Sequence, residues 1–506
     1  TANIQGLSAT QLAAVGTANI TAIDEADITA LGSLQLRALD GLQVAALSTL
    51  QLAAISSVGM RGLTPALLKQ IDSTKIVALQ SQALAVLNAE QLGGLTTAQL
   101  DGLTTSQVAA LASLSIRGLS TSQIQAMGIV SFAGLTNAQL VSLSTSDLNL
   151  GALSSLQLKG LSTTQYANLS EAQLQALSAA TIAGVPVEAF QAIGATKITA
   201  FEAQDLVGLS STQLRGFATA QIEVLLSAQV TALSSAAIKG LAIQQVAALG
   251  TKQALGFTLS NIRGLGPEQL SNLSGIVVNS LPSAAFLGVN SAQLSGLSAA
   301  QLGQLSSTQL SSVVAAAITG LGTNLGLLNT AQLQGLTSRN VPGLSTSQLV
   351  SLGTAKLAAL DASDIAALKS SQFAGFAPDQ VGALSAAQLK ALTPDGLRGL
   401  STTQLRQIDT SNINALSTQA LSALSATQLA GLSSTQLQAF GDDQVVALPS
   451  AAVGALPTQL IGSLGVLGMG GLRPDQIAVL STSDLRIAQL SSAQAVGLTT
   501  AQVSNL

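Results

Sequence analysis

Residues 400–408 read LSTTQLRQI, and the same eight-residue unit, L-S-T-x-Q-L-x-A/G, recurs along the chain. The first Leu of the unit returns every eight residues, and a second apolar residue follows it by five, as at Leu400 and Leu405. A spacing of eight matches neither the alternation of a strand nor the three- and four-residue spacing of one long helix. Each unit, or octad, is therefore a short element of its own, and the chain is a repeat array.

The residues around each apolar pair predict a short capped helix. Ser401 and Gln404 have the spacing of a capping box, in which the Ser hydroxyl accepts from the N3 amide and the Gln side chain accepts from the amide of the cap residue. Leu400 and Leu405 occupy the N′ and N4 positions of a hydrophobic staple. Proline favours the first helical position. Five prolines fall at this position of the repeat: Pro65, Pro267, Pro378, Pro394 and Pro474.

Glycine marks the predicted end of the helix. It stands just before the next unit's Leu at Gly94, Gly102, Gly118 and Gly134. A residue in this place is commonly a helix C′ residue in the left-handed conformation. We therefore expect left-handed backbone at these glycines.

Helices of one and a half turns do not survive alone, so they must stack on neighbours. We predict an all-α repeat solenoid of very short capped helices, one per eight residues. Three helices per coil are favoured by residues that repeat at a spacing of 24, namely Gly160, Gly184 and Gly208, Arg37 and Arg61, and Arg215, Lys239 and Arg263. A helical hairpin of two octads per coil is the alternative. Residues 1–506 are expected to form one continuous solenoid, as a fragment of a longer chain.

The register of the repeat slips at three places. Ten residues separate Leu143 from Leu153 and Leu480 from Leu490, and seven separate Leu321 from Leu328. We interpret these slips as insertions and deletions absorbed in loops. Bends or contact points are the alternative.

Composition excludes several classes of function. The chain is 47% hydrophobic with a net charge of -4, which is unlike a disordered chain. It has no Cys and no His, so it lacks disulfides, thiolates, the commonest metal ligand and the usual general base. A pI of about 4.9 argues against nucleic-acid binding. No apolar run reaches the length of a transmembrane helix.

The few charged residues are predicted to serve the helices or the solvated surface. Single acids fall at cap or first-turn positions, where the helix dipole favours an anion: Asp72, Asp361, Asp379, Asp395 and Asp409. The densest clusters are residues 24–27, which read DEAD, and Asp442-Asp443. We interpret both as charged first turns, with weak Ca²⁺ binding as the alternative.

Basic residues mostly follow the second apolar position, and they include Arg37, Arg61, Arg117, Lys159, Arg215, Lys239 and Arg263. We expect solvated side chains there, with a basic column facing an anionic surface as the alternative. Tyr166 and the Phe residues, such as Phe132, Phe190 and Phe373, are assigned to the core. We expect no catalytic residue, no cofactor and no metal site, and hence no enzyme.

The octads LSTxQLxAL and LTTxQVxAL resemble the long repeat tracts of very large proteobacterial surface proteins. Those are exported, adhesin-like chains often labelled as haem-utilisation or calcium-binding proteins. The resemblance covers the whole chain and implies export, secreted or cell-surface residence, and a structural or adhesive role. No site can be transferred from it, because this chain has no His or Cys to ligate haem.

Three functions are compatible with these features. We expect a structural protein that self-assembles into a filament, matrix or surface layer, because uniform uncharged octads can pack laterally without desolvating charge. Its partners are then other copies of the chain, with the cell surface as a further partner. The alternative is a monomeric stalk of a cell-surface adhesin. A minor alternative is an ice-binding solenoid, whose regular Ser and Thr rows would order water.

Overall fold

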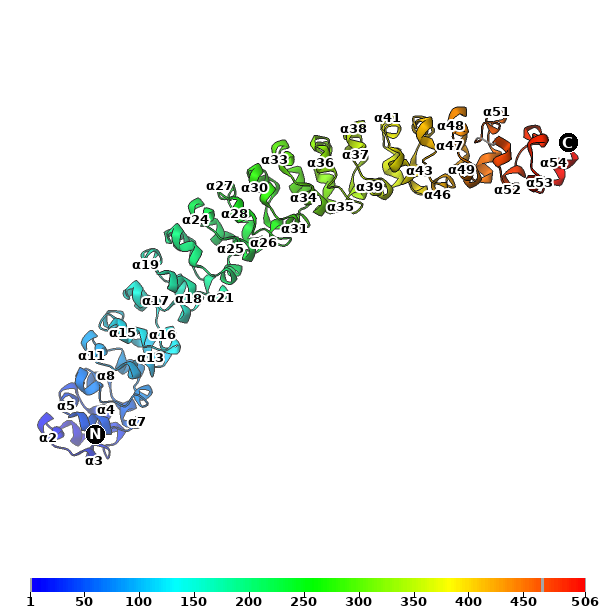
Figure 1. The fold of residues 1–506 in the computed structure, drawn as a ribbon. Coiled ribbons are helices and arrows are strands. Elements are labelled where there is room, and N and C mark those ends of the chain that lie inside the picture. The colour runs from blue at the N-terminus through cyan, green and yellow to red at the C-terminus, as the bar shows by residue number, and fades with distance from the viewer. Residues whose placement is uncertain (1, 466–467, 506) are drawn as a thin grey trace. The chain divides into compact units, whose positions relative to one another are not determined.

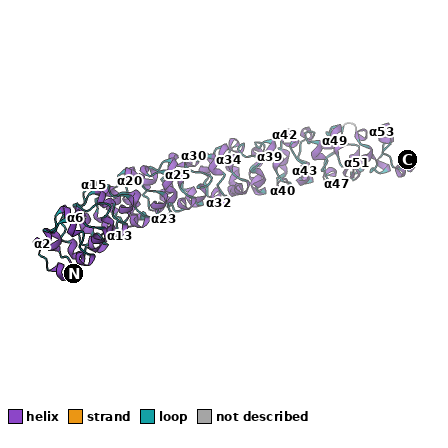
Figure 2. Cartoon of the chain, turned by 90° about the horizontal axis from the view of Figure 1, so that it is seen from below, coloured by secondary structure: helices purple, strands orange, loops and turns teal. Residues whose placement is uncertain are grey.

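The computed structural model describes residues 2–465 and 468–505, and every regular element in them is a helix. The chain divides into two compact units, residues 1–248 and 249–506. Within each unit, short helices lie side by side (Figure 1) and are joined by loops, without strands in the described part of the chain (Figure 2). The predicted all-α repeat solenoid is confirmed.

Each unit consists of three columns of helices, because each helix packs against the third helix along the chain. In residues 1–248 the first column contains α2 (Ala9–Ala13), α5 (Ser33–Arg37), α8 (Ser57–Met60), α10 (Ser81–Leu84), α13 (Thr105–Ala110), α16 (Ile129–Ala133), η3 (Leu150–Ala152), α20 (Glu171–Gln175), η4 (Ala195–Ala200), α24 (Thr219–Glu223) and α27 (Ile243–Ala247). The second contains α3 (Thr17–Ile20), α6 (Gly41–Ala46), α9 (Pro65–Leu68), α11 (Ala89–Gly93), α14 (Ser113–Ile116), α17 (Asn137–Ser142), α18 (Ser155–Lys159), α21 (Ala179–Ile182), η5 (Ala203–Gly208) and α25 (Ser227–Ala232). The third contains α1 (Ala2–Gln5), α4 (Glu25–Ala30), α7 (Thr49–Ala54), η1 (Ile76–Ala78), α12 (Thr97–Asp101), α15 (Thr121–Gln125), η2 (Thr145–Asp147), α19 (Thr163–Asn168), α22 (Val187–Ala192), α23 (Ser211–Arg215) and α26 (Ser235–Ile238).

The unit of residues 249–506 is built in the same way. Its first column contains α29 (Pro267–Ser271), α32 (Ser291–Ser295), α35 (Ala315–Ile318), η8 (Val341–Gly343), α39 (Ala362–Ala367), α42 (Ala386–Lys390), α45 (Thr410–Ile413), α48 (Ser434–Gln438), α51 (Thr458–Ile461), η10 (Thr482–Asp484) and α54 (Thr500–Ser504). Its second contains α28 (Thr251–Ala254), α30 (Gly275–Ser280), α33 (Ala299–Gln304), η7 (Thr319–Leu327), α37 (Thr346–Ser351), α40 (Ser370–Ala374), α43 (Pro394–Gly399), α46 (Thr418–Leu421), α49 (Asp442–Ala447), η9 (Gly468–Gly471) and η11 (Ile487–Gln489). Its third contains η6 (Ile262–Gly264), α31 (Ser283–Phe286), α34 (Ser307–Ser312), α36 (Thr330–Leu333), α38 (Gly353–Leu357), α41 (Pro378–Gly382), α44 (Thr402–Leu405), α47 (Ala426–Ala430), α50 (Ser450–Gly454), α52 (Pro474–Ile477) and α53 (Ser492–Ala495). Three octads therefore make one coil, not two.

The predicted caps form as expected. Ser210 Oγ accepts a hydrogen bond from the Gln213 amide at 3.2 Å, and Gln213 Oε1 accepts one from the Ser210 amide at 3.0 Å. The five prolines assigned to the first helical position begin α9, α29, α41, α43 and α52. The hydrogen bonds between Ser210 and Gln213 satisfy amides at the start of a helix that has few internal hydrogen bonds.

The two apolar positions of the octad build the core of each unit. Leu209 is 4% exposed and Leu214 is fully buried, and burying one such side chain stabilises the fold by about 1.5–3 kcal/mol. The aromatic residues assigned to the core, including Phe132 and Phe190, are buried as predicted. Tyr166 is buried too, and its hydroxyl donates to the Leu158 carbonyl at 2.7 Å.

The glutamine of the octad also bridges successive coils. Gln51 Nε2 donates to the carbonyls of Ile20 and Ile23, both at 2.7 Å. Those carbonyls lie 31 and 28 residues earlier, at the end of a helix in the preceding coil. The Ile20 carbonyl also accepts from the Ile23 amide at 3.2 Å. One buried glutamine side chain therefore bonds to the Ser48 amide and to two carbonyls at a helix end, where main-chain partners are few.

The left-handed conformation predicted for Gly94, Gly102, Gly118 and Gly134 is wrong. Gly94 and Gly134 have φ of -77° and -74°, and the glycines with positive φ in the described chain are Gly322, Gly353, Gly465 and Gly468. Close packing between coils explains the glycines instead. A Cβ at Gly134 would lie 2.7 Å from Thr105 Cα, and one at Gly118 would overlap the Ala89 carbonyl oxygen.

The ten-residue slips do not lie in loops. Residues 144–153 form η2 and η3, two short 3-10 helices that replace two octads. Gln157 Nε2 consequently reaches the Leu135 carbonyl 22 residues back, six fewer than the usual 28. The second slip, at residues 481–490, repeats this arrangement with η10 and η11. The seven-residue slip is accommodated by Gly322, whose φ of 52° few other residues adopt.

Candidate functional surface

The outward positions of the octads carry small polar side chains together with a set of exposed apolar residues. These share the second position of their helices and are each more than half exposed: Leu34, Leu42, Leu50, Val58, Leu114, Val130, Leu156 and Ile276. Leu34, Leu42 and Leu50 belong to α5, α6 and α7 and so lie on the three sides of one coil. Covering such side chains removes apolar surface from water, which favours association.

Basic residues spaced by 24 line up as the three-helix coil requires. Arg37 and Arg61 lie at the ends of α5 and α8 in one column, and Arg215 and Lys239 lie at the ends of α23 and α26 in another. All four are exposed. Exposed charges of this kind contribute little to stability, so the columns are a surface feature.

Three lysines occupy the glutamine position of their octads, which sequence analysis did not notice. Lys197 Nζ donates to the carbonyls of Ala167 and Leu169 at 3.0 and 2.7 Å. Lys75 Nζ donates to the Leu47 carbonyl at 3.1 Å, and Lys356 Nζ donates to the Gly326 carbonyl. Each ammonium group therefore replaces the glutamine Nε2 at the junction between coils.

Acids at cap and first-turn positions behave as predicted. Asp409 accepts from the Ser411 hydroxyl and amide, and these hydrogen bonds lower the pKa of Asp409. Hydrogen bonds from Thr74 lower the pKa of Asp72 in the same way. In the DEAD cluster, Asp24 caps α4 and accepts from the Asp27 amide at 2.7 Å. Asp442 and Asp443 lie in the first turn of α49.

A different group of acids stands at the buried glutamine position. Its members are Asp27, Asp147, Asp205, Asp364 and Asp484. Burial raises the pKa of Asp205, with a further contribution from Glu202. Burial and the nearby Asp361 carboxylate raise the pKa of Asp364 to about 6. An ionised carboxylate has no proton to donate to the carbonyls that glutamine would serve.

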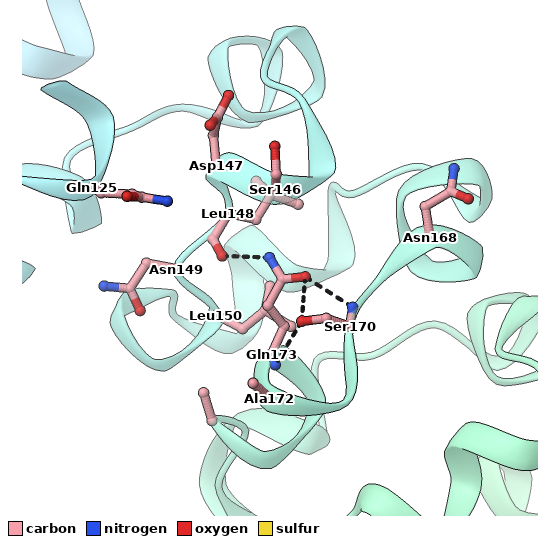
Figure 3. A pocket seen from close by; sticks show the side chains of 11 residues that line it. Gln125, Ser146, Asp147, Leu148, Asn149, Leu150, Asn168, Ser170, Ala172 and Gln173 are labelled. Atoms are coloured by element: carbon pink, nitrogen blue, oxygen red, sulfur yellow. Dashed lines mark hydrogen bonds between the residues drawn. The ribbon is translucent and has the colours of Figure 1, made fainter. Parts of the chain in front are cut away.

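An open pocket of about 520 Å³ lies beside the shortened coil. Figure 3 shows Gln125, Asn149 and Asn168 around it, and the Gln173 side chain bonded to Ser170 and to the Leu148 carbonyl. Asp147 lines the pocket and accepts from the Ser144 hydroxyl at 2.5 Å. The amide groups can hydrogen bond to a polar molecule.

Metal-ligand clusters and membrane-spanning helices were also sought in the described part of the chain. No cluster of three or more His, Cys, Asp or Glu side chains suitable for a metal occurs within residues 2–465 and 468–505. None of the helices in that part of the chain is long and apolar enough to cross a membrane.

Burial raises the pKa of Tyr166, in keeping with its place in the core. Cap hydroxyls such as Ser210 Oγ already bond to main-chain amides, which argues against free hydroxyl rows for ice.

Comparison with known families finds one kind of match. Residues 76–113, 198–235 and 357–394 match the model of the ALTTAQ repeat. The first stretch contains LTTAQ at residues 95–99, in which Thr96 is the cap of α12 and Gln99 its N3 residue. The match confirms a repeat region, and the repeat family indicates a repeat-containing structural protein. No curated protein matches the chain.

Proposed function

We propose that this chain is a secreted or cell-surface structural protein, without enzymatic activity, that self-assembles into a filament, matrix or surface layer. The observation that carries the proposal is the exposed apolar residue at the second helical position, repeated on a surface with few charges. The resemblance to exported repeat tracts supports the location outside the cell.

The energetics favour association between copies. Burying a fully exposed leucine is worth about 1.5–3 kcal/mol, and the low charge leaves little repulsion or charge desolvation to oppose close packing. Because the exposed apolar residue recurs at the helices named above, the same kind of contact can form at several coils. Self-assembly then follows from several weak contacts of one kind.

Electron microscopy and sedimentation of the purified chain test this proposal. Ordered fibres or sheets are expected, and Leu34→Ser, Leu42→Ser and Leu50→Ser combined should raise the concentration needed for assembly by about tenfold or more, since 1.4 kcal/mol is a factor of ten. Thr49→Ser, at the neighbouring exposed position of α7, is the control. Isolated rods at every concentration would contradict self-assembly and support the monomeric adhesin stalk instead.

The location has its own test. Antibody against the repeat should label intact cells, and protease added outside should remove the signal. Labelling that requires permeabilised cells would contradict a secreted or cell-surface location.

A further inference from the structure

Asp364 occupies the place of the bridging glutamine in α39 but performs only half of its role. Its carboxylate accepts a hydrogen bond from the amide of the cap residue Asp361, as glutamine Oε1 does in other octads. Asp364 is only 2% exposed, and its buried Oδ2 has no hydrogen-bond partner. A buried polar atom without a partner is costly and calls for a physical explanation.

The next coil shows what stands in this place when the residue is glutamine. Gln388 of α42, in the same column, accepts from the Ser385 amide at 3.0 Å. Its Nε2 donates to the carbonyls of Leu357 and Leu360 at 3.1 and 2.8 Å. The corresponding carbonyls for Asp364, 31 and 28 residues back, belong to Leu333 and Leu336.

We propose that Asp364 makes α39 a pH-responsive joint between coils. With a proton on Oδ2, the carboxylic acid donates to a main-chain carbonyl of the preceding coil, as glutamine Nε2 does elsewhere. When the proton leaves for solvent, two groups that only accept hydrogen bonds face each other, and the joint loosens.

The surroundings agree with this assignment. Asp361 caps α39, but its side chain makes no capping hydrogen bond, and its charge opposes ionisation of Asp364. The elements packed against α39 or adjoining it carry Arg339 before η8, Lys356 on α38, Lys369 at the start of α40 and Lys390 on α42. Arg339, Lys369 and Lys390 are exposed, and Lys356 is held by the Gly326 carbonyl. None of the four forms an ion pair with Asp364 among the described residues.

The sign of the pH effect follows from the direction of the shift. The pKa of Asp364 rises from 3.8 to about 6 on folding, so the stabilisation is fully present below about pH 4 and is lost as the pH rises through about 6. A shift of about two pK units limits the change in local opening to about 100-fold.

Hydrogen exchange of the whole chain at about pH 4.5 and about pH 7.5, corrected for intrinsic rates, tests the proposal. Protection of α39 should fall by about tenfold or more at the higher pH, while α42 with Gln388 should not change. Asp364→Asn should keep α39 protected at both pH values, and Asp364→Ala should leave it unprotected at both. Equal protection of α39 at both pH values in the unmodified chain, or a pH dependence that persists in Asp364→Asn, would overturn the proposal.

Discussion

At the residue scale, glutamine is the side chain that turns a row of octads into a solenoid. Sequence analysis found its bond to the cap amide, because that bond depends only on a spacing of three. It did not find the two carbonyl partners, because they lie 28 and 31 residues away and become neighbours only when three octads close a coil. The sequence did contain one signal of a special role: at this single position glutamine is replaced in some octads by Asn, Lys, Ser or Asp.

The bridging role predicts that Gln213→Ala is more harmful than loss of the cap hydroxyl. Gln213 Nε2 donates to the carbonyls of Ile182 and Val185, both at 2.9 Å. Truncation removes the side-chain partner of the buried Val185 carbonyl and of the Ser210 amide, whereas the Ile182 carbonyl still accepts from the Val185 amide at 3.0 Å. The loss should cost about 2 kcal/mol or more. Ser210→Ala should cost about 1 kcal/mol. Urea unfolding of both variants measures the difference, and an equal or smaller cost for Gln213→Ala would exclude the bridge.

Glycine at the end of the octad predicts a second contrast. A Cβ at Gly184 would overlap the Ser155 carbonyl oxygen of the preceding coil, whereas one at Gly194 would meet nothing within 4 Å. Gly184→Ala should therefore destabilise the fold by about 2 kcal/mol, and Gly194→Ala should be neutral or slightly stabilising. Thermal unfolding of the pair checks this. A neutral Gly184→Ala would mean that coil spacing does not require glycine there.

At the element scale, capping boxes, staples and first-position prolines could be predicted, because each is a local spacing rule. The structure of the ten-residue slips could not be predicted, because each slip keeps the leucine of the next unit. In the sequence it therefore resembles an octad with a longer loop. Only the structure shows that Thr145–Asp147 and Leu150–Ala152 are two separate sides of a coil. Both slips begin with Ser-Thr-Ser-Asp, and this shared start was the available signal.

This interpretation predicts that residues 144–153 can be replaced by two complete octads. The replacement restores the 28-residue spacing seen for Gln51, puts two apolar pairs in place of the buried Leu148, Leu150, Ala152 and Leu153, and closes the pocket beside Asp147. We expect unchanged or higher thermal stability and full exchange protection of α18 and α20. If α18 and α20 unfold in the variant with two octads, the shortened coil is required by its neighbours.

At the scale of the whole molecule, each unit is a chain of nearest-neighbour contacts, because its helices pack on the helices one coil before and after them within the unit. The spacing of 24 between glycines and between basic residues predicted this arrangement correctly. The division into units of residues 1–248 and 249–506 has no signal in the octads, because the repeat continues unchanged through Leu249.

The most direct test of the octad solenoid is hydrogen exchange of Leu209→Asp beside Ser210→Ala. Leu209 is 4% exposed, so an aspartate there buries an unpaired charge, which should cost several kcal/mol. In a nearest-neighbour array the damage stays local. Leu209→Asp should lose protection at about residues 200–220 and in the coils that contact them, while distant coils stay protected and Ser210→Ala leaves the array intact. A loss of protection spread uniformly along the chain would contradict the account, and so would a larger effect from Ser210→Ala than from Leu209→Asp.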